Sequence, residues 1–143
     1  MFNSFIAAEK FVKEHNIRMV DLKFSDLAGR WHHVTISSGE FTQQLMIDGI
    51  GFDGSSVGLK SVKSGDMALI PDLSTGIIDP FWEIPTLSFI SNTVEADTKA
   101  LFQDDPREVA RRAEATLIGS KLATHSLWGP EFEFYILNEI AYD

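Results

Sequence analysis

The order of elements along the chain predicts an α+β fold, with helices packed on one mixed or antiparallel sheet. Residues 20–25 and 31–36 alternate apolar and polar side chains on either side of a glycine-containing turn, which is typical of a β-hairpin. Apolar side chains at helical spacing come before this hairpin. After it, a capping sequence predicts a second helix and several short apolar runs predict strands, so strands outnumber helices in the predicted domain.

The first helix is predicted over residues 3–16, where apolar side chains recur at helical spacing. Asn3 or Ser4 can cap its start, because a short polar side chain there can accept a hydrogen bond from a free backbone N–H group.

A second helix is predicted after the hairpin. Ser37 and Glu40 have the spacing of a capping box, in which each side chain bonds the backbone of the other residue. The helix that they open is expected to bury Phe41 and Leu45 and to end near Gly49.

Residues 51–65 are rich in glycine and serine and are predicted to form a long loop. Prolines punctuate the apolar segments that follow the loop, which favours short strands with turns between them. The expected strands cover residues 67–70, 76–78 and 86–90.

A polar stretch at 93–104 marks the predicted domain boundary. The helix after it has a strong start, with Asp105 as the cap and Pro106 at the first helical position. Gly119 is expected to end this helix, whose apolar face would comprise Val109, Ala113 and Leu117.

Composition narrows the classes of function. The 143 residues carry a formal net charge of −9, with a pI of about 4.8, and no basic stripe, so neither nucleic acid nor an anionic membrane is an expected partner. The absence of cysteine excludes disulfides and thiolate metal sites. No apolar run approaches the length of a membrane helix, and we expect a cytoplasmic protein.

Two glutamates near the end of the sequence form a candidate metal site. Glu131 and Glu133 alternate with Phe132 and Phe134, so a strand would place both carboxylates on one face, with Cα atoms about 6.6 Å apart. A divalent cation such as Mg²⁺ or Mn²⁺ would relieve the repulsion between them. The same alternation also fits an ordinary half-buried strand with its glutamates in water, and the hexapeptide alone does not decide between the two.

The loop at 51–65 holds a second candidate. Asp53 and Gly54 are followed by Ser55 and Ser56, a sequence that commonly forms a tight turn with serine hydroxyls bonded to nearby backbone. The loop is nevertheless long for a simple connection, which makes a functional role for Asp53 plausible.

The sequence contains an ordered series of segments, which is more specific than any one of them: Val20-Asp21-Leu22-Lys23-Phe24-Ser25-Asp26, His33-Val34-Thr35-Ile36, Phe52-Asp53-Gly54-Ser55-Ser56, Asp105-Pro106-Arg107 and Gly129-Pro130-Glu131-Phe132-Glu133-Phe134. Taken in this order, from about residue 15 to the end of the sequence, the segments resemble glutamine synthetases of the bacterial type.

The resemblance implies a β-grasp N-terminal domain over residues 1–101. The first helix and first strand of a truncated catalytic domain would then occupy residues 102–143. It also implies a ligase that joins ammonia to glutamate with ATP through a γ-glutamyl phosphate. Two divalent cations, Mg²⁺ or Mn²⁺, would organise the phosphates and the carboxylate.

Individual roles follow from the same resemblance. Glu131 and Glu133 match glutamates that each serve a different cation. Asp53 matches the catalytic aspartate that reaches across a subunit interface to bind ammonium and withdraw its proton, and Ser56 matches its neighbour in that substrate site. The implied assembly is a homo-oligomeric ring, taken to be a dodecamer.

The sequence departs from the family pattern at three places. Residues 57–60 lack the usual aromatic side chain, Phe132 replaces a common proline, and Asn138 replaces a common acidic residue. A related γ-glutamyl ligase for another amine therefore stays open, as does a stand-alone β-grasp module that binds synthetase rings. The remaining metal ligands and the ATP pocket would lie beyond residue 143, so the chain alone is expected to be inactive.

Overall fold

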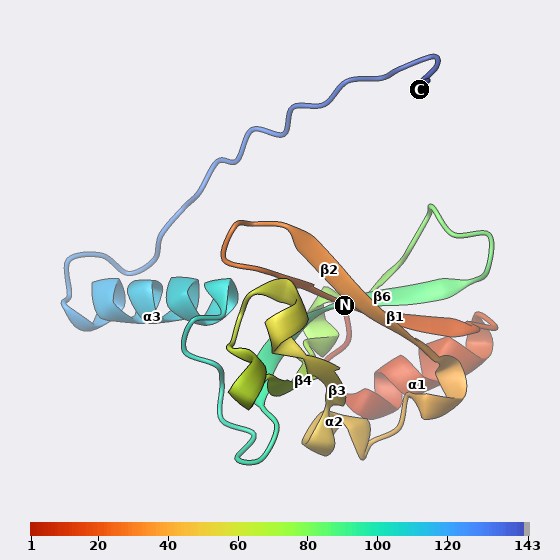
Figure 1. The fold of residues 1–143 in the computed structure, drawn as a ribbon, viewed down its shortest axis with the longest axis horizontal. Helices are drawn as coiled ribbons and strands as arrows, with labels where there is room; N and C mark the ends of the chain where they lie inside the picture. The colour runs from red at the N-terminus through yellow and green to blue at the C-terminus, as the bar shows by residue number, and fades with distance from the viewer. Residues whose placement is uncertain (142–143) are drawn as a thin grey trace. The chain divides into compact units, whose positions relative to one another are not determined.

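The computed structural model describes residues 1–141, and its strands form one mixed sheet in the order β2-β1-β6-β4-β3, with β5 added to β6 (Figure 1). The strands are β1 (Met19–Ser25), β2 (Trp31–Ser37), β3 (Ile50–Asp53), β4 (Asp66–Pro71), β5 (Ile77–Ile78) and β6 (Thr86–Glu95). The α-helices are α1 (Phe5–Glu14), α2 (Leu45–Asp48) and α3 (Pro106–Gly119). This arrangement confirms the predicted α+β class.

The pairing of β1 with β6 is the only parallel pairing between the described strands, and it runs from Met19 opposite Thr86 to Lys23 opposite Ile90. Every other pairing is antiparallel. The first strand therefore lies beside the last one, in the middle of the sheet.

The core lies between α1 and one face of the sheet. Val20 and Leu22 of β1 and Leu87 of β6 are fully buried, and Ala8 of α1 packs into the same cluster. Phe89 of β6 is also buried, at 1% exposure. Because side chains alternate along a strand, Asp21 and Lys23 of β1 project from the opposite face of the sheet.

The first helix and the hairpin are confirmed. Helix α1 is two residues shorter at each end than predicted, and the Ser4 hydroxyl oxygen caps it by accepting the Ala7 N–H at 3.3 Å. In the hairpin, Val20 lies opposite Ile36, which is the register that buries the apolar faces of both strands together.

The predicted start of the second helix is wrong. Ser37 makes no capping hydrogen bond, and the chain forms a short 3₁₀ turn at Ser38–Glu40 before α2 begins at Leu45. Phe41 and Leu45 are buried as predicted. The helix also ends at Gly49 as predicted. The φ of Gly49 is 69°, a conformation that favours glycine.

One loop prediction and two strand predictions need correction. The predicted loop at 51–65 begins as an edge strand, because residues 50–53 pair with β4, which follows in the sequence. The strand expected at 76–78 shrinks to two residues, while the strand expected at 86–90 continues to Glu95. Pairing with β4 accounts for the longer strand, since Ser91 to Glu95 bond to that neighbour.

Helix α3 has the predicted bounds at both ends. Asp105 caps it, with Oδ1 accepting the Arg107 N–H at 2.9 Å. Its predicted apolar face is not buried: Val109 is 45% exposed, and Ala113 is exposed. The chain forms two compact units, Met1–Arg112 and Ala113–Asp143, divided within α3. The sequence-predicted domain boundary at 101/102 stays a prediction.

Candidate functional site

Asp53 lies at the end of β3, at the point where the edge strand turns into a 3₁₀ helix over Gly54–Val57. Its carboxylate caps that turn. Oδ1 accepts the Ser55 N–H at 2.9 Å, and Oδ2 accepts the Ser56 hydroxyl at 2.7 Å. The structure therefore brings Asp53 and Ser56, both predicted site residues, into direct contact at an exposed position.

The surroundings of Asp53 keep it charged. Hydrogen bonds from Ser55 and then from Ser56 hold the pKa of the Asp53 carboxyl below its ordinary value, because they stabilise the anion more than the acid. At neutral pH the side chain is an exposed, preoriented carboxylate. Such a group can attract a small cation or accept hydrogen bonds from one.

Gly54 is required where it stands. A Cβ atom at this position would overlap the side chain of Met67 on β4, which is almost fully buried. The Gly54 N–H also donates to the Gly65 carbonyl oxygen at 2.7 Å, which closes the loop at its base. The turn after Asp53 thus owes its path to the lack of a side chain at Gly54.

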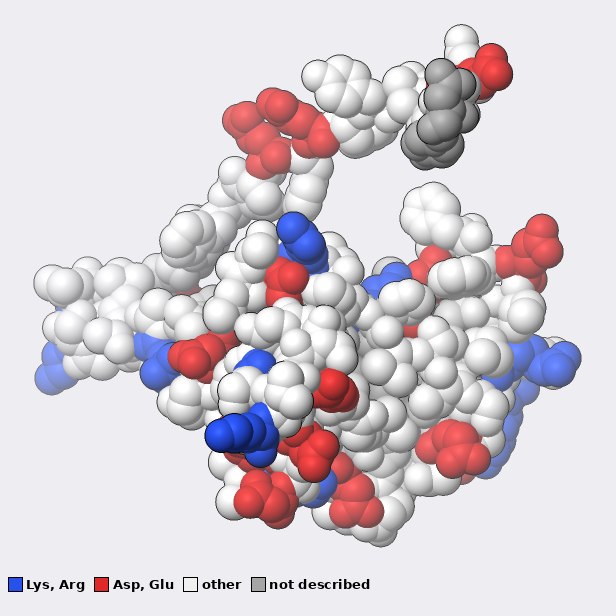
Figure 2. Space-filling view, in the orientation of Figure 1, with Lys and Arg blue, Asp and Glu red and all other residues white. Residues whose placement is uncertain are grey.

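Residues 129–134 do not form the predicted strand. The segment has no regular secondary structure, and both Glu131 and Glu133 are exposed, as are Phe132 and Phe134. A strand needs a neighbour with which to pair its backbone, and no residue between 1 and 141 pairs with this segment. In Figure 2, acidic side chains stand exposed on this extended part of the chain.

The metal assignment therefore has two candidate ligands and no completed site. Among residues 1–141, no group of three or more His, Asp or Glu side chains is placed to hold a metal ion. The carboxylates of Glu131 and Glu133 are the right donors for Mg²⁺ or Mn²⁺, but two are too few to enclose either ion.

A polar cluster that the sequence patterns did not predict lies on the face of the sheet opposite the core. Asp21 is 1% exposed, and its Oδ1 accepts the Thr35 hydroxyl at 2.6 Å and lies 2.7 Å from His33 Nδ1. Lys23 donates to Asp79 Oδ2 at 2.6 Å, and this bond holds the pKa of the Asp79 carboxyl below its ordinary value. The alternation of Asp21 and Lys23 was the available signal, but Asp79 reaches the cluster only through the fold.

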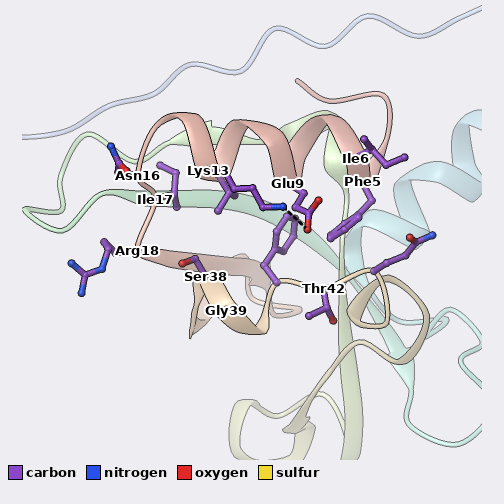
Figure 3. Close-up of a pocket in the computed structure, with 13 residues that line it drawn as sticks. Phe5, Ile6, Glu9, Lys13, Asn16, Ile17, Arg18, Ser38, Gly39 and Thr42 are labelled. Atoms are coloured by element: carbon purple, nitrogen blue, oxygen red, sulfur yellow. Dashed lines mark ion pairs between the residues drawn. The ribbon is translucent and has the colours of Figure 1, made fainter.

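An open groove of about 650 Å³ lies between α1 and the segment at 38–43 (Figure 3). Phe5 and Ile17 contribute apolar surface to its lining, and Lys13 pairs with Glu9 along the helix at 3.1 Å. Neither Asp53 nor Ser56 lines this groove, so the predicted site and the groove are separate features.

Comparison with known proteins identifies the fold of the unit that carries Asp53. The family model of the glutamine synthetase β-grasp domain matches residues 16–96, which is more than half of the chain. The chain belongs to the glutamine synthetase family. The predicted β-grasp fold is thereby confirmed for these residues.

Two relatives show how far the family likeness extends. Glutamine synthetase of Azotobacter vinelandii is 39% identical over 134 residues, which cover 93% of this chain and 29% of that protein. A Cupriavidus pinatubonensis protein named 3-hydroxylaminophenol mutase is 38% identical over 135 residues, covering 94% of this chain and 29% of its own length. This member of the glutamine synthetase family thus spans less than a third of either relative.

The fold is also found in solved structures. The cryo-EM structure of Plasmodium falciparum glutamine synthetase superposes with a TM-score of 0.74, covering 83% of this chain and 23% of that one, at 16% identity. At that identity the likeness supports the fold alone. In the part of the chain that the structure describes, no helix has both the length and the apolarity to cross a bilayer.

Proposed function

We propose that the chain is the N-terminal part of a glutamine synthetase, whose complete form ligates ammonia to glutamate with ATP in the cytoplasm. The observation that carries this proposal is the preoriented Asp53 carboxylate in a family-matched loop. We assign residues 1–101 to the β-grasp domain and residues 102–143 to the start of the catalytic domain.

In the proposed reaction, the glutamate side-chain carboxylate attacks the γ-phosphorus of ATP and releases ADP. Ammonia then attacks the carbonyl carbon of the γ-glutamyl phosphate, and inorganic phosphate leaves. Ammonium must lose a proton before its nitrogen can attack. Asp53 is the group in this chain that would bind ammonium and accept that proton, with Ser56 beside it.

The local geometry favours the binding part of this role. The hydrogen bonds from Ser55 and Ser56 hold the anionic Asp53 carboxylate in one orientation in which it can bind ammonium, and by lowering its pKa they make it a weaker base. An exposed position at the edge of the sheet is suited to completing the active site of a neighbouring subunit. We propose a homo-oligomeric ring, a dodecamer, in which this contact repeats head to tail.

Glu131 and Glu133 would hold divalent cations in the complete enzyme. Bound Mg²⁺ or Mn²⁺ would supply neutralisation of the phosphate charge during phosphoryl transfer. Within this chain, the two glutamates would contribute ligands and ATP would be a substrate of the longer protein.

The metal proposal predicts weak binding by the chain itself. We expect Mg²⁺ or Mn²⁺ to bind with a Kd on the order of millimolar, because ligand number and rigidity set the affinity. Calorimetry on the Glu131→Ala/Glu133→Ala double variant should show that this binding is lost, whereas Glu139→Ala should retain it. Micromolar affinity that survives the double substitution would show that the metal site lies elsewhere.

The function itself is tested by product formation. Purified 143-residue chain and the native polypeptide from the source cell are each given glutamate, ATP and hydroxylamine, which replaces ammonia and yields a coloured hydroxamate. We expect hydroxamate from the native polypeptide when it continues past residue 143, and none from the chain. ATP-dependent product from the chain would overturn the fragment proposal, and none from a longer native polypeptide would overturn the ligase proposal.

A second candidate is a γ-glutamyl ligase that takes another amine. The specific observation is that residues 57–60, which follow Ser56, contain no aromatic side chain. Comparing ammonia with methylamine and larger amines as nucleophiles for the native polypeptide would separate the two reactions, since the better substrate has the higher kcat/KM.

A further inference from the structure

The loop that follows Asp53 returns to the sheet only at Asp66, where β4 begins. Between these points it contains two 3₁₀ turns, Gly54–Val57 and Val62–Ser64, and no β-strand. The backbone hydrogen bonds within residues 54–65 join parts of the loop to one another rather than to a neighbouring strand, so the position of its first turn depends on where the loop is attached.

Lys60 attaches the middle of the loop to the body of the unit. Its Nζ forms an ion pair with Glu95 Oε2, at the end of β6, and stands 5.6 Å from the ring centre of Phe102. The Lys60 side chain is only 15% exposed. The ion pair and the cation–π contact hold the Lys60 ammonium group in place, and its low exposure limits the screening of its charge by water and salt.

The backbone carries this attachment directly to the turn that Asp53 caps. The N–H groups of Leu59 and Lys60 both point to the Gly54 carbonyl oxygen, at 2.9 and 3.4 Å. Leu59 is itself buried. Gly54, which follows Asp53, is therefore hydrogen-bonded to Leu59, which is buried, and to Lys60, which forms the ion pair.

The other end of the attachment continues into the start of α3. The Phe102 N–H donates to the Thr93 carbonyl oxygen at 2.9 Å, and the Thr93 N–H donates to Asp105 Oδ2 at 2.8 Å. Asp105 caps α3. One bonded series thus connects the Asp53 loop, the last strand and the segment that leads into the helix.

The loop has a second lysine that serves as an internal comparison. Lys63 lies three positions after Lys60, is exposed, and forms no ion pair or side-chain hydrogen bond with the described residues. The two lysines share the loop and the charge, and differ in attachment.

We propose that Lys60 is a positioning residue that holds the Asp53 loop in register with the segment leading into α3. This inference rests on the proposed function for its catalytic meaning, because it makes the placement of the ammonium-binding carboxylate depend on a side chain that touches no substrate. Loss of the attachment frees the turn, weakens the serine hydrogen bonds to Asp53 and leaves Glu95 without its partner.

The first test needs only the 143-residue chain. In Lys60→Met, which keeps most of the stem but removes the charge, amide hydrogen exchange at residues 54–59 is expected to rise about 10-fold or more. The pKa of the Asp53 carboxyl, followed by NMR, should rise toward the ordinary value of an aspartate. Lys63→Met should change neither quantity. Lys60→Arg, which keeps the positive charge, should leave both close to their values in the parent chain.

Unchanged exchange and an unchanged Asp53 pKa in Lys60→Met would overturn the inference. Glu95→Gln provides a second route if Lys60→Met does not fold, since it removes the same ion pair from the other side and must likewise raise amide hydrogen exchange at residues 54–59. In the longer native polypeptide, Lys60→Met should raise the KM for ammonium about 10-fold and leave the KM for ATP unchanged. The NMR results do not depend on ligase activity, so failure of the inference and failure of the proposed function are separate outcomes.

Discussion

Replacing Phe89 by alanine is expected to destabilise the β-grasp unit by about 3–5 kcal/mol. Phe89 is 1% exposed on β6, and its ring packs against Phe41 at 5.4 Å and Phe2 at 6.1 Å between centroids. The substitution removes a large apolar side chain and leaves a cavity that rigid neighbours fill only in part. Small domains have a total stability of only about 5–15 kcal/mol, so much of it would be lost.

Urea unfolding followed by circular dichroism measures this effect through the transition midpoint. Phe81→Ala is the matched control, because Phe81 is 92% exposed and its removal should change the stability by less than about 0.5 kcal/mol. Equal midpoints for the Phe89 and Phe81 variants would mean that the core described above is wrongly placed.

Asp53→Asn should reduce ammonia-dependent glutamine synthesis by the native polypeptide by about 100-fold or more. Asparagine keeps the shape of the side chain and can still accept the Ser56 hydroxyl bond, but it has neither the negative charge that attracts ammonium nor an oxygen that takes a proton. Phosphorylation of glutamate precedes the entry of ammonia in the proposed scheme. It should therefore persist, and be seen as slow ADP release without ammonia.

The control for this prediction is Asp97→Asn, which removes a carboxylate of the same kind from an exposed turn, where its one bond to the described residues comes from the neighbouring Thr98 N–H. Its rate should match that of the parent protein. If Asp53→Asn lost ADP release together with glutamine synthesis, the role of Asp53 would lie before the ammonia step, and the assignment made here would fail.

Local signals predicted much of the fold correctly. The β1–β2 hairpin was recognisable because its alternating side chains and its turn lie within one short stretch, and Ser4 and Asp105 cap helices at the positions that their residue types favour. The contact between Asp53 and Ser56 is equally local, since the two residues are three positions apart in one turn.

Errors arose where partners are distant in the sequence. The length of β6 depends on β4, which pairs with Ser91 to Glu95. The mostly polar sequence at 91–95 does not by itself predict this pairing. Ser37 had the right spacing for a cap, but it is the last residue of β2, its side chain makes no capping hydrogen bond, and only a three-residue 3₁₀ turn follows it.

At residues 129–134 a predicted strand is absent, again because strand formation depends on a distant partner. Its alternation fits a strand, yet backbone pairing decides whether a strand forms, and the described residues provide no partner. The attachment of Lys60 to Glu95 and Phe102 was likewise invisible, because a lysine in a polar loop looks the same whether it is fastened or free.

The parallel pairing of β1 with β6 has a consequence for how the molecule reaches its native state. Among the described strands β6 is synthesised last, yet it inserts between β1 and β4, which are both made earlier. Until Thr86–Glu95 has left the ribosome, the inner edges of both strands lack their partners and stay open to wrong pairing. Closure over such a long sequence separation is slow, so we expect the sheet to assemble in one late cooperative step rather than strand by strand.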